Sequence, residues 1–477
     1  MTRLLTLIIF LWTQLAVGQP DARDLLTKES ALEDLTILET SLLEIHPSIY
    51  RYTSKNEFKR DFENARNAIK QSLRIIEFSN LVAPIIAKVH CGHTFTIVSY
   101  VDENKGLLPL EVKLINDRLF VLKNYSSRKE LLPGSEILEI NGIPTANLLR
   151  NFRSKAVSDG YGLTFKDRTI EKYFRENFAT YINQPDSFQI SFEDYETKNF
   201  KIATIEALTN ESIRRKVEDL HPAEEKPLDF YITKEKNVAV LKLRSFMAKG
   251  IKKQSGQNLK KVIKKSFEEM EKNKVNNLVI DIRWNTGGKA SAAPLLFSYL
   301  TNKDFKFKRK LIFRHGYRFS YPEYLNRNKF NDWVNKNLDK KINDSTYEWT
   351  HHRNTKKTYK AKNNPYDGNL YIIINGMTAS SGAEFAALAH VNGKGIFVGE
   401  ESGGDYNGVN GYDRTYLQLP HSKIGLTIAG WRSIMAWDET KYIGHGVPPT
   451  YEVYPEIKDL LTGQDTELKF IYALIKK

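Results

Sequence analysis

The spacing of apolar residues changes along the chain and predicts three differently built regions. From Asp21 to about Leu81 apolar residues recur at helical intervals, and His46-Pro47 breaks the pattern, so we expect a small helical N-terminal subdomain over residues 20–96. The stretch Ile85–Thr96 is typical of a helix end that turns through Gly92 into a strand. The apolar positions of the helical pattern are Leu32, Leu35, Leu38, Leu42, Leu43, Phe58, Phe62, Ala65 and Ile69.

Short alternating strands between Leu107 and about Ile205 predict a small β-rich module over residues 97–210. Within it, Leu132–Pro144 places a Pro-Gly turn and an Asn-Gly turn on either side of a short apolar strand. This unit resembles a PDZ domain, a family in which an exposed sheet edge captures the C-terminus of a peptide by strand addition. Two roles stay open: peptide capture, or packing against the core and gating it. The predicted strands are Leu110–Ile115, Arg118–Leu122, Ile137–Ile140 and Phe188–Phe192.

Strands and helices alternate over residues 228–477, which predicts an α/β core with a substantially parallel sheet. The charged segment Glu211–Leu228 is interpreted as a linker before this core. A Tyr-, Asn- and Lys-rich interval at about 317–367 has little apolar periodicity and is predicted to be an insertion over the core. The core elements are strand-like Asp229–Leu243, helical Gly256–Lys272, strand Leu278–Ile282, helix Ser291–Leu300, strands Leu311–Phe313 and Leu370–Ile374, helix Ala383–His390 and strand Ile396–Val398.

Composition supports a globular protein of about two to four domains, since the 477 residues are 41% apolar and 12% aromatic. The net charge of +14 raises the question of anionic partners. Much of the positive charge around residues 252–265 is interleaved with Gln and Glu on an amphipathic helix pattern, which is typical of a solvated helix face. We therefore expect no nucleic-acid partner.

The N-terminus carries the pattern of a secretory signal peptide over residues 1–19. Arg3 precedes an apolar run, Leu4–Trp12, and Ala16-Val17-Gly18 forms a small-residue cleavage pattern. The apolar run is shorter than the roughly 20 residues that a membrane span needs. We expect a secreted or periplasmic protein without a membrane span after removal of the signal peptide. The single Cys91 excludes an internal disulfide and a thiolate zinc site, so neither metal nor cofactor is expected.

Two turns at the ends of buried strands carry the candidate chemistry. In Asp281–Gly288, glycines lie between a strand and a helix, where backbone N–H groups can face an oxyanion; a phosphate-binding loop would end in Gly-Lys-Ser/Thr. After strand Leu370–Ile374 the chain turns sharply and starts a helix whose first turn carries Ser380 and Ser381. Ser381, with a glutamate three residues later, also fits a purely structural capping box.

Three strings in order resemble the core of the C-terminal processing (tail-specific) serine peptidases. They are Asp281–Gly288, Thr378–Glu384 and Val398–Gly404. The resemblance implies that the nucleophile is Ser381, three residues before the glutamate. It also implies an α/β peptidase core beside a PDZ-like module and a substrate that is a peptide or an unfolded protein. Ser380 is the less favoured serine.

The general base is where this chain departs from most of that family, which uses a lysine in a Phe-Gly-Lys-Gly string. The corresponding stretch here is Ser402–Val409, and no lysine occurs between Lys394 and Lys423. The branch with the tricorn core peptidase and relatives of interphotoreceptor retinoid-binding protein has a histidine in an Asp-Gly-His-Thr string, which Cys91–Thr94 matches at three of four positions. This resemblance implies His93, and an imidazole is ready to accept a proton at neutral pH.

The remaining site residues follow from the same resemblance. In the tricorn-like branch an acidic residue downstream of the nucleophile orients the histidine, which brings in Asp438 and Glu439, with Glu439 preferred. We predict that the oxyanion hole consists of the N–H of Gly382 and that of Gly287 or Gly288. Other histidines have no motif behind them: His90 is interpreted as a packed histidine, and His351, His352 and His445 stay alternative bases.

Together these patterns indicate a secreted serine endopeptidase with a Ser-His(-Glu) arrangement. One alternative is a catalytically inactive peptide-binding or scaffold homologue, because the lysine is missing and Cys91 stands where the matched string has aspartate. Another is a serine hydrolase or binder for a small apolar ligand, as the retinoid-binding relatives suggest.

Overall fold

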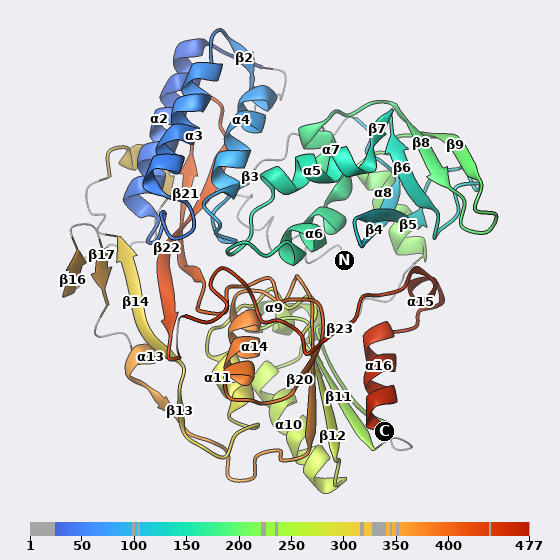
Figure 1. The fold of residues 1–477 in the computed structure, drawn as a ribbon, viewed down its shortest axis with the longest axis vertical. Coiled ribbons are helices and arrows are strands. Elements are labelled where there is room, and N and C mark those ends of the chain that lie inside the picture. The colour runs from blue at the N-terminus through green and yellow to red at the C-terminus, as the bar shows by residue number, and fades with distance from the viewer. Residues whose placement is uncertain are drawn as a thin grey trace.

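Three groups of elements surround a long antiparallel hairpin, which consists of β21 (Asn410–Gln418) and β22 (Gly425–Met435) (Figure 1). Among the residues that the computed structural model describes, no helix is long and apolar enough to cross a membrane. The predicted signal peptide lies outside these residues. They are 24–97, 101–102, 105–220, 226–233, 237–314, 319–326, 340–343, 346–349, 353–437 and 440–476.

The first group is helical, as the periodicity predicts. The helices are α2 (Lys28–Ile45), α3 (Lys55–Ala68) and α4 (Ile75–Ala87). Ser54 caps α3 in a capping box with Glu57, and α2 ends at Ile45 with His46 as its C-cap. The buried sides of these helices pack on sheet residues that come much later in the chain: Leu417, Leu419, Leu426 and Ile428.

The second group is an antiparallel sheet of order β4-β5-β6-β8-β9, with β7 paired to β6. Four helices belong to this region, and the sequence patterns did not predict them. One of them, α8, overlaps the predicted linker, which is therefore wrong there: Ile213 is buried against Leu107 and Tyr125. The elements are β4 (Leu110–Ile115), β5 (Arg118–Asn124), β6 (Glu136–Ile140), β7 (Ile143–Pro144), α5 (Thr145–Lys155), α6 (Thr164–Lys172), α7 (Phe174–Tyr181), β8 (Ser187–Glu193), β9 (Phe200–Glu206) and α8 (Asn210–Leu220).

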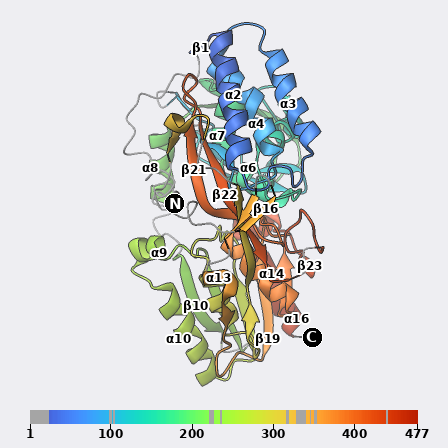
Figure 2. The same cartoon turned by 90° about the vertical axis from the view of Figure 1, so that its left-hand side faces the viewer.

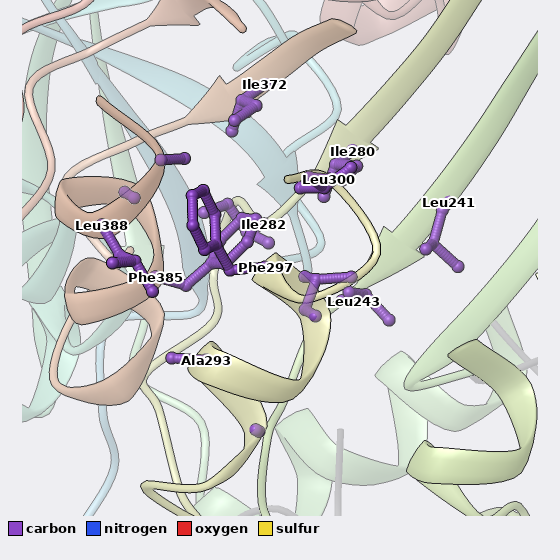
Figure 3. Packing of buried hydrophobic residues seen from close by; sticks show 14 of the residues in the cluster. Leu241, Leu243, Ile280, Ile282, Ala293, Phe297, Leu300, Ile372, Phe385 and Leu388 are labelled. Carbon is purple, nitrogen blue, oxygen red and sulfur yellow. The ribbon is translucent and has the colours of Figure 1, made fainter. Parts of the chain in front are cut away.

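The third group is the α/β core, a sheet of order β10-β11-β12-β19-β20-β23. Every pairing in it is parallel except β10 with β11, which splits the predicted strand Asp229–Leu243 into two. Side chains from the sheet, α11 and α14 fill the space between them (Figure 3). The elements are β10 (Leu228–Thr233), β11 (Val238–Leu243), α9 (Ala248–Ser255), α10 (Leu259–Lys272), β12 (Asn277–Asp281), α11 (Ala292–Phe297), β19 (Asn369–Ile374), α14 (Ser381–Val391), β20 (Ile396–Gly399), β23 (Tyr451–Glu452), α15 (Ile457–Thr462) and α16 (Thr466–Ile475).

A further antiparallel sheet, of order β15-β21-β22-β14-β17-β16, lies between the N-terminal helices and the core (Figures 1 and 2). Short β3, which follows α4, pairs with β22 and so joins an early segment to a late one. Described parts of the predicted insertion, β15 to β17, extend this sheet at its two edges. The strands are β3 (Phe95–Ile97), β14 (Lys308–Arg314), β15 (Leu325–Asn326), β16 (Lys340–Asn343), β17 (Thr346–Glu348), β21 (Asn410–Gln418) and β22 (Gly425–Met435).

Candidate active site

The turn between β19 and α14 presents the predicted nucleophile. The side-chain oxygen of Asn375 accepts hydrogen bonds from the N–H of Met377 (3.1 Å) and of Trp284 (3.0 Å), which fixes the start of this turn. Ser380 then has φ 50° and ψ −129°, a backbone conformation that residues other than glycine rarely adopt. The next residue, Ser381, is the first of α14.

The hydroxyl of Ser381 has no structural task among the described residues. The side chain is buried, at 2% exposure, and its Oγ has no hydrogen-bond partner. The capping-box interpretation of Ser381 and Glu384 is wrong, because no side chain caps this helix and the Glu384 carboxylate lies 2.6 Å from Lys308 Nζ. A buried hydroxyl without a partner is costly unless a ligand or a reaction uses it.

The glycine turn after β12 packs directly against this serine. The backbone oxygen of Asn285 accepts the N–H of Ala379 (3.0 Å), so the two turns are hydrogen-bonded to each other. Gly287 has φ 93°, and a Cβ on it would lie 2.7 Å from Ser380 Cβ and 2.8 Å from the Ser381 nitrogen. Only a glycine allows the two backbones to approach so closely.

The backbone N–H groups of Gly288 and Ser381 have no hydrogen-bond partner among the described residues. The other two predicted donors are occupied. Gly287 N–H donates to Asn285 Oδ1 (2.9 Å), and Gly382 N–H donates to the Ala379 oxygen (2.9 Å). Of the three predicted glycines, Gly288 is therefore the one whose N–H is available to an oxyanion here.

His93 lies in the turn between α4 and β3. The hydroxyl of Thr94, the next residue, accepts the N–H of Ala429 in β22 (3.1 Å). A Cβ on Gly411 of β21 would lie 3.5 Å from His93 Nε2, so the imidazole rests on that strand. The Nδ1 atom of His93 is buried and has no hydrogen-bond partner within the described ranges. Burial, together with the charge of nearby Arg414, lowers the pKa of His93 to about 4, and the ring is neutral at physiological pH.

Asp159, which no sequence pattern indicated, holds the turn that carries His93. Its Oδ1 accepts the N–H of Gly92 at 2.8 Å. The side chain is buried, and burial, with further contributions from Asp405 and Glu384, raises the pKa of Asp159 to about 7. It comes from the loop between α5 and α6, so a residue of the β-rich region reaches the site.

Lys308 is a second residue that sequence reasoning missed. It is fully buried on β14, and its Nζ contacts Glu384 (2.6 Å) and the hydroxyl of Ser433 (3.0 Å). These contacts attach the first turn of α14 to β14 and β22. The signal available in the sequence was weak: a lysine between Phe307 and Arg309 in a charged, alternating stretch.

The other predicted residues are placed as follows. Asp438, Glu439, His351 and His352 lie outside the described residues. His445 Nδ1 lies 3.2 Å from Glu401 Oε1 on a half-exposed side chain. His90 packs between Tyr52 and Tyr161, with its Nδ1 2.7 Å from the Gly160 oxygen. Within the described ranges, no group of three or more His, Cys, Asp or Glu side chains could hold a metal ion.

The mixed α/β fold and the motif-bearing turns define the class of this protein, a serine-type peptidase. More narrowly, the model of peptidase family S41 matches residues 237–453, which include the α/β core and the motif-bearing turns. This confirms the predicted peptidase family and enzyme class, and it confirms the predicted fold class at the level of a mixed α/β protein.

Two solved structures of mature CPAF share the fold at low sequence identity. The crystal structure of mature CPAF is 13% identical, with a TM-score of 0.65 over 94% of this chain and 97% of that chain. Mature CPAF complexed with lactacystin is 14% identical, with a TM-score of 0.64 over 94% and 98%. The photosystem II D1 C-terminal processing protease is 13% identical, with a TM-score of 0.41 over 94% and 97%. No match was found among curated protein sequences.

Proposed function

We propose that this protein is a secreted serine endopeptidase that cleaves peptides or unfolded proteins through Ser381, His93 and Glu439. The match of residues 237–453 to the model of peptidase family S41 supports peptide or protein as the substrate class. The signal-peptide pattern of residues 1–19 supports secretion. The tricorn-like resemblance, through Cys91–Thr94, supports histidine as the base.

One observation carries the assignment of the nucleophile: the buried hydroxyl of Ser381, at the start of α14 beside the glycine turn, has no hydrogen-bond partner in the part of the chain that the structure describes. In the proposed reaction Ser381 Oγ attacks the scissile carbonyl while His93 takes the hydroxyl proton. The oxyanion that forms receives hydrogen bonds from the N–H groups of Gly288 and Ser381. His93 then returns the proton to the leaving amine, and the acyl-enzyme is hydrolysed by water.

The neutral state of the His93 imidazole favours histidine over lysine as the general base. A base must have a free lone pair before the reaction, and the neutral imidazole of His93 has one. Lys308 is a buried lysine that contacts the first turn of α14, but its ammonium group is already engaged by Glu384 and Ser433.

For the β-rich region we propose the PDZ-like role of capturing substrate. Its last strand, β9, lies at the edge of the sheet order, and its outward side chains include Phe200 and Ile202, which are 63% and 56% exposed. An edge strand with exposed apolar side chains can receive an extended peptide by strand addition.

The test compares two adjacent serines in the mature protein. We expect Ser381→Ala to lower cleavage of an unfolded protein by at least about a thousandfold, since the nucleophile is lost. Ser380→Ala is the matched control and should keep most of the activity. A serine-directed fluorophosphonate should label the wild type and Ser380→Ala stoichiometrically, and Ser381→Ala not at all.

His93→Ala tests the base in the same assay. It should lower kcat by at least about a hundredfold while circular dichroism shows a folded protein. Undiminished turnover by Ser381→Ala would refute the nucleophile, and undiminished turnover by His93→Ala would refute the base alone.

A further inference from the structure

One row of paired residues crosses the antiparallel sheet. It starts at Gly411, which lies beside His93, and its next three residues are aromatic. Gly411 of β21 is paired with Trp431 of β22, Trp431 with Phe313 of β14, and Phe313 with Tyr347 of β17. Directly paired residues of antiparallel strands point to the same face of the sheet, with Cβ atoms about 5 Å apart. The row therefore occupies a single face.

His93 lies on that face. The Cβ direction of Gly411 points at the imidazole, and a Cβ there would lie 3.5 Å from His93 Nε2. Trp431 is the next position of the row, about 5 Å further on. Because position 411 is a glycine, no side chain stands between Trp431 and the imidazole within the row.

The first turn of α14 lies over the neighbouring row of the same face. Ser433, two residues after Trp431, points to the same side of β22, and its hydroxyl contacts Lys308 Nζ (3.0 Å). Lys308 in turn contacts Glu384, one helical turn after Ser381 (2.6 Å). Trp431 therefore lies between His93, the candidate base, and Ser433, which is linked through Lys308 and Glu384 to the helix that begins with Ser381.

The aromatic residues form one apolar surface. The rings of Trp431 and Trp349 are 5.2 Å apart at 68°, and those of Phe313 and Tyr347 are 5.8 Å apart. Trp431 and Phe313 are buried, whereas Tyr347 and Trp349 are partly exposed at the outer end. The opposite face at these strands carries Ile312 paired with Arg432 and Glu348, so the aromatic character belongs to the site's face alone.

We propose that Trp431, Phe313, Tyr347 and Trp349 form the wall of a substrate subsite that accepts an aromatic or large aliphatic side chain flanking the scissile bond. This inference rests on the proposed function and adds a substrate preference to it. The four rings provide apolar contact area, the rings of Trp431 and Trp349 meet edge to face at 68°, and no charged side chain belongs to the row. An apolar wall of this size discriminates large from small apolar side chains by tenfold or more.

The experiment measures a ratio, which is insensitive to the amount of folded enzyme. Internally quenched peptides with one cleavage site are made with Phe, Leu, Ala or Asp at either residue that flanks the scissile bond. For the wild type we expect kcat/KM to be at least tenfold higher with Phe or Leu than with Ala at one of the two positions, and lowest with Asp. Trp431→Ala should reduce this ratio at least fivefold at the same position.

A matched pair of variants separates the subsite from general packing. Phe313→Leu removes a buried ring of the wall. Phe152→Leu removes an equally buried ring in the β-rich region, which meets Phe174 edge to face at 5.6 Å. We expect Phe313→Leu to lower the Phe-to-Ala ratio and Phe152→Leu to leave it at the wild-type value. Equal ratios in the wild type, Trp431→Ala and Phe313→Leu would overturn the subsite.

Failure of the subsite and failure of the proposed function give different results. If the wild type and the wall variants react with the fluorophosphonate at Ser381 but share one side-chain preference, the subsite is wrong and the peptidase site stands. If Ser381→Ala still cleaves the peptides, the peptidase site itself is wrong, and with it the subsite.

Discussion

Burial of its imidazole determines how His93 titrates. The ring is packed against Gly411, its Nδ1 is inaccessible, and Arg414 adds a positive charge nearby, so the pKa of His93 falls from 6.5 to about 4. A histidine in this state holds its lone pair ready well below neutral pH. The consequence is a base that stays competent under mildly acidic conditions.

The acid limb of the pH profile tests this state. We expect kcat/KM to remain flat from pH 7 down to about 5 and to fall near pH 4, because kcat/KM reports ionisation of the free enzyme. Short assays with circular dichroism at each pH keep unfolding separate from protonation. An acid limb centred near pH 6.5 would contradict the buried, neutral His93.

Asp159 gives the opposite kind of pH dependence, this time in stability. Its pKa is raised from 3.8 to about 7, so the folded state binds this proton more tightly than the unfolded state does. The stability that it contributes is present below pH 4 and is lost as the pH rises through 7, at a slope of up to about 1.4 kcal/mol per pH unit. Asp159→Asn keeps an acceptor for the Gly92 N–H and should remove this slope.

Urea denaturation of the wild type and Asp159→Asn at several pH values between 4 and 8 measures the difference. We expect the free energy of unfolding of the variant to gain on that of the wild type as the pH rises. Asp159→Ala, which removes the acceptor as well, should be less stable than Asp159→Asn at pH 8. Parallel curves for the wild type and Asp159→Asn would show that the carboxyl has an ordinary pKa.

At the scale of elements, helix α14 is attached to two strands through one buried ion pair. Lys308 and Glu384 are both buried, and Ser433 supplies a further hydrogen bond. Removal of one partner leaves the other charge buried and alone, which costs about 3 to 5 kcal/mol, whereas an apolar replacement of both can be nearly neutral. The stability of α14 at its first turn therefore depends on the pair as a unit.

We expect Lys308→Met to lower the free energy of unfolding by about 3 to 5 kcal/mol and the double variant Lys308→Met/Glu384→Leu by clearly less. Chemical denaturation of the two variants and of Glu384→Leu completes the cycle. Ser433→Ala, which keeps the ion pair, should cost only about 1 kcal/mol. A double variant less stable than both single variants would mean that the pair is not the unit that matters.

The sequence predicted those elements that depend on local patterns. Strands β12 and β19, the turns after them and helix α14 follow from a buried run, a turn and a small-residue helix, all within a few residues. The capping box at Ser381 was wrong because Glu384 has a stronger partner in Lys308, which no local pattern reveals. Strand β22 was missed because both of its faces are covered, by the N-terminal helices and by the site, so apolar and polar positions alternate poorly.

At the scale of the whole molecule, three distant segments meet beside the site. Gly160 N–H donates to the His90 oxygen, and the next residue, Tyr161, donates its N–H to the oxygen of Gly444 (2.7 Å). A Cβ on Gly160 would lie 2.2 Å from that same oxygen. The β-rich region, the N-terminal helices and the core are thus locked together at a contact that tolerates no side chain.

Two glycines with the same backbone angle isolate the effect of this contact. Gly160 has φ +70° and Gly142 has φ +72°, but nothing lies within 4 Å of a Cβ on Gly142. Gly142→Ala should cost only the strain of a left-handed alanine, about 1 to 2 kcal/mol. We expect Gly160→Ala to cost clearly more and, through Asp159, to slow fluorophosphonate labelling of Ser381. Equal losses in the two variants would refute the tight junction.

Site residues that are placed only by such long-range contacts could not be predicted from the sequence. His93 and Ser381 could be proposed by resemblance, but Asp159 and Lys308 belong to the site only because the fold brings their loops and strands there. A residue of this kind has no signature at its own position in the chain. Its role becomes visible only through partners such as Gly92 and Glu384.

Because β3 pairs with β22, the turn that carries His93 cannot be held in place until late in the synthesis of the chain. The turn with His93 is made early by the ribosome, whereas the strand that holds it, and the serine that it is proposed to serve, emerge only near the end of synthesis. A nascent chain therefore possesses neither half of the site in working order. On the proposed mechanism, activity can begin only after β22 has been made and has paired with β3.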